Sequence, residues 1–119
     1  MLKSKIHKAT VTAANVEYEG SMTIDEDIME AADIIENEQI QVVNVTNGSR
    51  IETYAIKGRK GSASMIINGA AAKLMHKGDK VIILTYMSLP DKEARENVPK
   101  IVKLNEKNEI VSLVTSDVV

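Results

Sequence analysis

Three Gly-Ser steps occur in the chain, at Gly20-Ser21, Gly48-Ser49 and Gly61-Ser62. Glycine and serine both favour turns, so the simplest interpretation of each step is a bend in the backbone. A serine hydroxyl that acts as a nucleophile needs a neighbouring group to activate it. The chain has only two histidines, and no Ser-His-Asp order is evident. Local chemistry therefore does not single out one of the three steps as functional.

The composition excludes several kinds of site. The chain has no cysteine, which excludes disulfides, thiolate catalysis and cysteine metal sites. His7 and His76 lack metal-ligand spacing, and no P-loop or GxGxxG motif is present, so we expect no metal. The net charge of −2 gives no reason to expect a nucleic acid or a membrane as partner. No segment is typical of a signal peptide or a membrane span, which predicts a cytoplasmic protein. On composition alone, a binding or structural module is favoured over an enzyme.

The elements that must position any site are mostly short strands. The Asn-Gly pair in 46–49 predicts a hairpin turn, and 15–20 is predicted to be a turn as well. The strand at 80–87 is the most apolar and is expected to be central in the sheet. Predicted strands are 2–12, 21–24, 39–45, 50–56, 63–67, 80–87, 100–104 and 109–114.

Two short helices are predicted between these strands. Apolar spacing indicates a helix within 24–35, with Asp25 as its N-cap, and a second within 68–79 that stops at Gly78. Because the chain has no Phe or Trp, the core must be built from aliphatic side chains and methionine. The pattern favours one mainly β, barrel-like domain over residues 1–119, with the last five residues expected to fray.

Several separated stretches give the sequence a resemblance to a known family. They read SKIHKATVT, YEGSMTIDED, VNVTNGSRIETYAI, IINGAAAKL and GDKVIILTY, at 4–12, 18–27, 43–56, 66–74 and 78–86. In order and spacing they resemble the pyruvoyl-dependent aspartate 1-decarboxylase family, without gaps to about residue 110. Ser4 departs from the pattern, which has Gly there. The resemblance implies a six-stranded double-psi β-barrel with a few short helices. It also implies a cytoplasmic homotetramer, with active sites between subunits, that makes β-alanine for pantothenate and coenzyme A.

The resemblance gives Gly20-Ser21 a chemical role. Removing the α-carboxylate of an amino acid leaves a carbanion, which needs an electron sink that ordinary side chains do not supply. Nothing in the sequence marks a cradle for pyridoxal phosphate. In the family, the serine hydroxyl attacks the preceding glycine carbonyl, and elimination and hydrolysis convert the serine into a pyruvoyl group. Ser21 would then form a Schiff base with L-aspartate, and self-cleavage would give 1–20 (β chain) and 21–119 (α chain). Whether a maturation factor assists stays open.

The remaining site residues follow from the resemblance by position. Arg50 matches a carboxylate-binding arginine, and Tyr54 matches the proton donor that quenches the carbanion. Thr53 and Asn68 match residues of self-cleavage, and Thr53 also contacts the substrate. Gly69, Ala70 and Ala71 match the family's substrate-binding segment. Lys5 lies on the first strand, which borders the site in the family. His7 and Tyr18 are weaker candidates for residues that line the site.

Two alternatives remain at this point. A double-psi barrel can host unrelated functions, so the chain could be a non-catalytic binding or assembly module. The same chemistry could also act on glutamate, because one methylene is worth only about 1–3 kcal/mol of discrimination.

Overall fold

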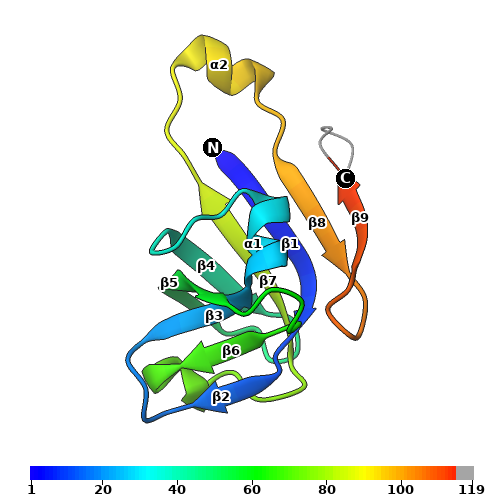
Figure 1. The fold of residues 1–119 in the computed structure, drawn as a ribbon. Coiled ribbons are helices and arrows are strands. Elements are labelled where there is room, and N and C mark those ends of the chain that lie inside the picture. The colour runs from blue at the N-terminus through cyan, green and yellow to red at the C-terminus, as the bar shows by residue number, and fades with distance from the viewer. Residues whose placement is uncertain (115–119) are drawn as a thin grey trace.

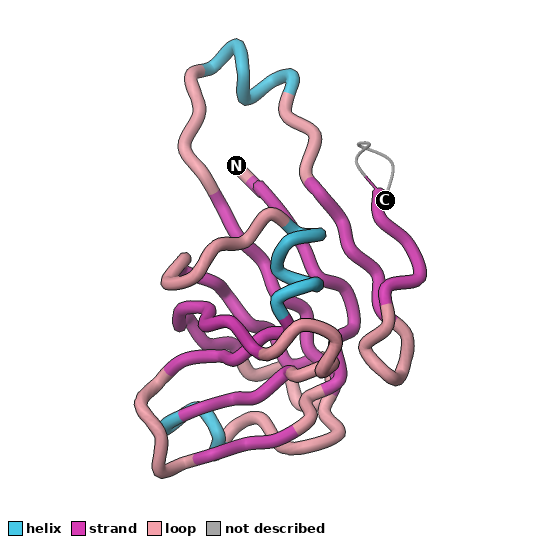
Figure 2. The backbone as a smooth tube through the Cα atoms, in the orientation of Figure 1, coloured by secondary structure: helices cyan, strands magenta, loops and turns pink. Residues whose placement is uncertain are grey.

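The computed structural model describes residues 1–114, and the tail at 115–119, which we expected to fray, lies outside the described residues. The prediction of a mainly β chain is confirmed (Figures 1 and 2). The strands are β1 Leu2–Thr10, β2 Ala13–Asn15, β3 Ser21–Asp25, β4 Gln39–Asn44, β5 Arg50–Gly58, β6 Met65–Asn68, β7 Lys80–Tyr86, β8 Lys100–Leu104 and β9 Ile110–Val114. The helices are α1 Glu26–Ala32, the 3-10 helix η1 Gly69–Lys73, and α2 Asp91–Glu96.

The nine strands follow one another side by side in the order β2-β6-β3-β5-β4-β7-β1-β8-β9. The predicted hairpin of β4 and β5 is confirmed, and its strands pair in antiparallel register from Gln39↔Tyr54 to Val43↔Arg50. The apolar strand β7 lies between β4 and β1, as its sequence predicted. Parallel pairing joins β3 to β5, β2 to β6 and β1 to β8.

The expected count of six strands is wrong, because residues 1–114 already form a sheet of nine. The predicted strand at 2–12 ends at Thr10. Residues 13–15, of which 15 was predicted to begin a turn and 13–14 were assigned to no element, form a separate strand paired with β6. At the other end, β8 pairs with β1 and β9 with β8, as strands predicted at 100–104 and 109–114 allow. Strand β2 depends on pairing between distant parts of the chain, which local patterns do not encode.

The core consists of aliphatic side chains and methionine, as the absence of Phe and Trp predicted. Strand β3 buries Met22 and Ile24 against the neighbouring strands. Helix α1 buries Ile28 and Met29 into the same cluster. The predicted N-cap is confirmed, because the Asp25 carboxylate accepts the N–H of Asp27 at 2.9 Å.

The second predicted helix is shorter than expected. Residues 69–73 form a 3-10 helix that is capped by Leu74, so the predicted end at Gly78 is wrong. Gly78 does have a positive φ of 92°, but its N–H bonds to the Val11 carbonyl in the turn that enters β7. Helix α2, where no helix was predicted, buries no residue and projects beyond the sheet (Figure 1). Over the described range, no helix has both the length and the apolar character needed to cross a membrane.

Ser4, which replaces the expected glycine, is accommodated by a buried hydroxyl pair. Its Oγ lies 2.5 Å from Oγ1 of Thr85 on β7, and neither residue is exposed to solvent. A buried hydroxyl is tolerated when it has a hydrogen-bond partner, so the departure from the family pattern fits the local structure.

Candidate active site

The Gly20-Ser21 step lies where the loop before β3 becomes strand. Ser21 is the first residue of β3 and pairs with Asn68, the last residue of β6. Its side chain is almost fully buried, and its Oγ donates to the Glu19 carbonyl at 3.4 Å. Gly20 itself is exposed and lines a surface hollow. The step therefore combines a buried, oriented hydroxyl with an accessible backbone.

Asn68 fixes the Ser21 hydroxyl from the neighbouring strand. Its side-chain Nδ2 donates to Ser21 Oγ at 3.0 Å and to Thr23 Oγ1 at 3.1 Å. Asn68 is only 5% exposed, so these bonds form in a largely desolvated position. The antiparallel pairing of β3 and β6 places the two side chains opposite each other, which explains why residues 47 positions apart meet.

Gly69 allows the 3-10 helix η1 to lie directly against the Gly-Ser step. Its φ of 83° is in the left-handed region that favours glycine. A Cβ at this position would lie 2.7 Å from Gly20 Cα and 2.9 Å from Gly20 N, which is closer than atoms can pack. Glycine at 69 is therefore required by both backbone conformation and space.

A hollow of about 350 Å³ opens beside the step. The structure brings together here five of the residues predicted for the site, namely Gly20, Thr53, Asn68, Ala70 and Ala71. The sequence analysis missed three further lining residues, Ile51, Glu52 and Leu74. The alternation of strand β5 could have indicated Ile51, which lies two residues before Thr53 and on the same face.

Other predicted residues are not brought to this hollow within one chain. Arg50 and Tyr54 alternate with Thr53 along β5, so their side chains leave the opposite face of that strand. Lys5 and His7 lie on β1, which is separated from β3 by strands β5, β4 and β7. Tyr18 is 54% exposed in the loop before the step.

His7 lies in a basic environment on β1. Its Nδ1 is buried and has no hydrogen-bond partner among the described residues. Burial, followed by the nearby charges of Lys5, Lys8 and Lys103, lowers the pKa of His7 below its ordinary value of 6.5. The imidazole is therefore neutral at pH 7, and the positive charge of this region comes from the lysines. In the described part of the chain, no group of three or more His, Asp or Glu could hold a metal ion.

Comparison with known proteins identifies the family of the chain. The sequence profile of a family described as aspartate decarboxylase matches residues 1–111. The chain belongs to the aspartate decarboxylase family. It is 58% identical over 113 residues to the aspartate 1-decarboxylase of Caldicellulosiruptor saccharolyticus, covering 95% of this chain and 88% of the relative. It is also 56% identical over 113 residues to that of Acetivibrio thermocellus, covering 95% and 90%. Membership makes the chain an enzyme, a decarboxylase, rather than a binding module.

The expected end of the resemblance near residue 110 agrees with the family profile, which stops at residue 111. Individual relatives extend further. The aspartate 1-decarboxylase of Bacillus cytotoxicus is 50% identical over 117 residues, covering 98% of this chain and 92% of the relative. The expectation that the last residues find no match is therefore wrong for that relative.

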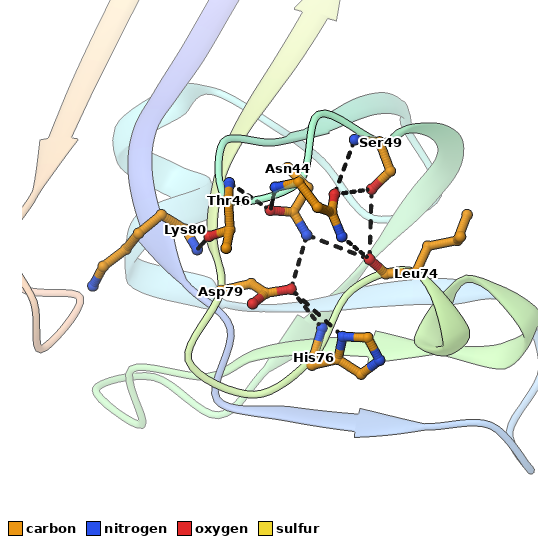
Figure 3. Close-up of polar contacts among 8 residues, drawn as sticks. Asn44, Thr46, Ser49, Leu74, His76, Asp79 and Lys80 are labelled. Atoms are coloured by element: carbon orange, nitrogen blue, oxygen red, sulfur yellow. Dashed lines mark hydrogen bonds and ion pairs between the residues drawn. The ribbon is translucent and has the colours of Figure 1, made fainter.

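In this decarboxylase, a polar network joins the β4–β5 turn to the segment that follows η1 (Figure 3). Asn44 is fully buried, and its Nδ2 donates to Asp79 Oδ2 at 2.8 Å and more weakly to the Leu74 carbonyl at 3.4 Å. The same Asp79 oxygen accepts the backbone N–H of His76 at 2.9 Å. The turn before Arg50 is thus tied to the chain just beyond the hollow.

We expect Asp79→Asn to destabilise the protein at neutral pH but much less in acid. The backbone N–H of His76 and then the Asn44 amide lower the pKa of Asp79 below its ordinary value of 3.8. A lowered folded-state pKa stabilises the fold above the unfolded pKa, and this contribution is lost as the pH falls through the folded value. Both donors contact Oδ2, so an amide oxygen can replace it and the substitution removes mainly the charge.

Urea unfolding of wild type and Asp79→Asn measures this difference. We expect a loss of about 1 kcal/mol at about pH 7 and a smaller loss at about pH 3, below the ordinary pKa of 3.8. A gap in unfolding free energy that stays the same at both pH values would show that the charge of Asp79 does not stabilise the fold.

Proposed function

We propose that the chain is an aspartate 1-decarboxylase that converts L-aspartate to β-alanine and carbon dioxide by means of a pyruvoyl group made from Ser21. The observation that carries the proposal is the hydrogen bond from Asn68 to the buried Ser21 hydroxyl, beside a glycine whose backbone opens to the hollow. The names of the relatives support the substrate. The product is the β-alanine from which pantothenate and coenzyme A are built.

The residues around the step fit the formation of a pyruvoyl group. The Ser21 hydroxyl is desolvated and held by one donor and one acceptor. Gly20 has no Cβ to obstruct attack on its carbonyl. The residue packed against Gly20 is Gly69, which has no side chain either. Once formed, a pyruvoyl group supplies a carbonyl that condenses with the substrate amine and accepts the electron pair left when carbon dioxide departs.

Self-processing would proceed at the 20–21 peptide bond. Ser21 Oγ attacks the Gly20 carbonyl carbon, the C–N bond breaks, and an ester with a free amine at residue 21 results. Loss of the Cα proton of residue 21 breaks the Cβ–Oγ bond, which leaves the Gly20 carboxylate and a dehydroalanine. Water then replaces the nitrogen, and ammonia leaves. Asn68 orients the attacking oxygen, and the Thr53 hydroxyl stabilises the developing oxyanion.

The substrate would occupy the hollow. Backbone N–H groups of the segment 69–71 suit one carboxylate, and the Arg50 guanidinium suits the other, since its paired donors match carboxylate geometry. Tyr54 donates a proton to the carbon that loses carbon dioxide. Lys5 adds positive potential for a dianionic substrate, while the neutral His7 and the exposed Tyr18 border the site.

We further propose that the active protein is a cytoplasmic homotetramer of single-domain, double-psi barrels with active sites between subunits. The placement of Arg50, Tyr54 and Lys5 supports this assembly, because strand alternation and sheet order direct them away from the hollow of their own chain. A neighbouring copy could then complete each site.

The proposed function is tested by incubating purified, processed protein with aspartate or glutamate and measuring the amine product by chromatography. We expect β-alanine from aspartate, and at most slow formation of 4-aminobutyrate from glutamate. Absence of β-alanine from a preparation that has undergone cleavage would overturn the assignment. Faster turnover of glutamate would keep the chemistry and change the substrate.

Asn68→Asp should slow self-cleavage about 10- to 100-fold, because it replaces the donor to Ser21 by a carboxylate of the same shape. Denaturing gels of the newly made protein over time would measure the rate. Thr23→Val is the matched control, since it removes the second acceptor of the Asn68 amide and leaves Ser21 untouched. If both variants cleave at the same rate, the Asn68–Ser21 bond does not drive processing.

A further inference from the structure

The β4–β5 turn, residues 44–49, holds the carbonyl of Leu74 with several donors (Figure 3). Asn47 Nδ2 donates to this oxygen at 2.9 Å, which is the shortest of the three contacts. Asn44 Nδ2 and Ser49 Oγ approach it at 3.4 and 3.5 Å. One backbone oxygen therefore meets three side chains of a turn that is distant in sequence.

Leu74 directly follows η1 and lines the hollow beside Gly20. Helix η1 has five residues and buries Gly69 and Ala72, and its short length gives it little stability of its own. Its first end is held by Asn68, which is part of strand β6. Its other end is held at the Leu74 carbonyl, and the position of the segment 69–71 depends on both ends.

The turn is built to present the Asn47 amide in one orientation. Asn44 Oδ1 accepts the N–H groups of Thr46 and Asn47 at 2.8 and 3.3 Å. Asn47 Oδ1 in turn accepts from Ser49 N at 2.9 Å and from Ser49 Oγ at 2.7 Å. With its oxygen occupied inside the turn, the Nδ2 of Asn47 is directed at Leu74.

We propose that Asn47 is a positioning residue, which holds the end of η1 and thereby sets the segment 69–71 against the Gly20-Ser21 step. Asn47 itself lies outside the residues that line the hollow and acts through Leu74. The inference rests on the proposed function for its kinetic consequence, but the contact can be tested independently.

Asn47→Asp tests the proposal, because it keeps the oxygen that serves the turn and removes the donor to Leu74. We expect the KM for aspartate to rise about fivefold, corresponding to one lost hydrogen bond, with kcat changed by less than about twofold. Amide hydrogen exchange at Leu74 and Met75, whose N–H groups both bond to Ala71, should become faster.

Asn105→Asp is the matched control. Asn105 also accepts two backbone N–H groups through Oδ1, from Lys107 and Glu109, and donates through Nδ2 to the Glu109 side chain. It lies in the β8–β9 turn, on the side of the sheet order opposite to β3 and β6. For Asn105→Asp, we expect the KM for aspartate and the amide hydrogen exchange at Leu74 and Met75 to equal those of the wild type.

The outcomes separate the inference from the proposed function. Equal KM values and equal exchange for Asn47→Asp and Asn105→Asp would overturn the positioning role. If the wild type makes no β-alanine, the proposed function fails, and exchange at Leu74 still decides whether Asn47 holds η1. If Asn47→Asp does not fold, Ser49→Ala removes a weaker donor without adding charge. For Ser49→Ala, a rise in KM and in amide hydrogen exchange smaller than that expected for Asn47→Asp would support the proposal. No change in either quantity would overturn it.

Discussion

Ser21→Ala should yield a chain that is never cut and that decarboxylates no aspartate above background. Alanine has no hydroxyl to attack the Gly20 carbonyl, so neither the ester nor the carbonyl electron sink can form. The fold should survive, because Ser21 contributes only two polar contacts and its Cβ position is retained. Intact mass spectrometry would measure cleavage, and β-alanine formation would measure activity.

Ser62→Ala provides the control for this experiment within the same chain. Ser62 also follows a glycine, and its hydroxyl bonds to Ser64 at 2.8 Å in a loop remote in sequence from the proposed chemistry. We expect this variant to be cleaved and active like the wild type. Cleavage of Ser21→Ala into two fragments, or loss of activity in both variants, would contradict the assignment of Ser21 as the processing residue.

Gly69→Ala should block processing almost as completely, but for a steric reason. The added Cβ would lie 2.7 Å from Gly20 Cα, so η1 and the Gly-Ser step must separate. The positive φ adds strain of about 1–2 kcal/mol for any residue with a Cβ. We expect self-cleavage to slow at least about 100-fold, because a displacement near 1 Å of reacting groups has effects of that order.

Gly78→Ala is the control that separates the effect of backbone strain from the effect of a steric clash with Gly20. Gly78 has a similar positive φ of 92°, yet no atom lies within 4 Å of its hypothetical Cβ. Both variants should lose stability in urea unfolding, whereas only Gly69→Ala should lose cleavage. Normal cleavage of Gly69→Ala would show that the contact between η1 and Gly20 does not matter for processing.

Local sequence patterns correctly predicted those elements whose structure is determined by residues close to one another in the sequence. The Asn-Gly turn determined the β4–β5 hairpin, and Asp25 caps α1 as its position indicated. By contrast, β2 exists because residues 13–15 pair with β6, and that pairing joins segments about 50 residues apart. The predicted helix at 68–79 failed at its end because Gly78 serves a turn into β7 and does not cap a helix.

The candidate site shows the same division between local and non-local information. Nothing local distinguished Gly20-Ser21 from the other two Gly-Ser steps, and the resemblance to a family was needed to select it. The bond from Asn68 to Ser21 depends on strand pairing, and the contact of Gly69 with Gly20 depends on η1 folding back onto the loop. Leu74 could not be predicted as part of the hollow, because its position is set by the turn at 44–49.

The central claim is that the active protein carries its own electron sink at residue 21, and the mass of the denatured protein tests it most directly. Purified wild type should separate into chains of 20 and 99 residues, which together account for the 119 residues of the sequence. Borohydride treatment with aspartate present should add mass to the longer chain only. A preparation that forms β-alanine but contains only the uncut chain, without such an adduct, would contradict the claim.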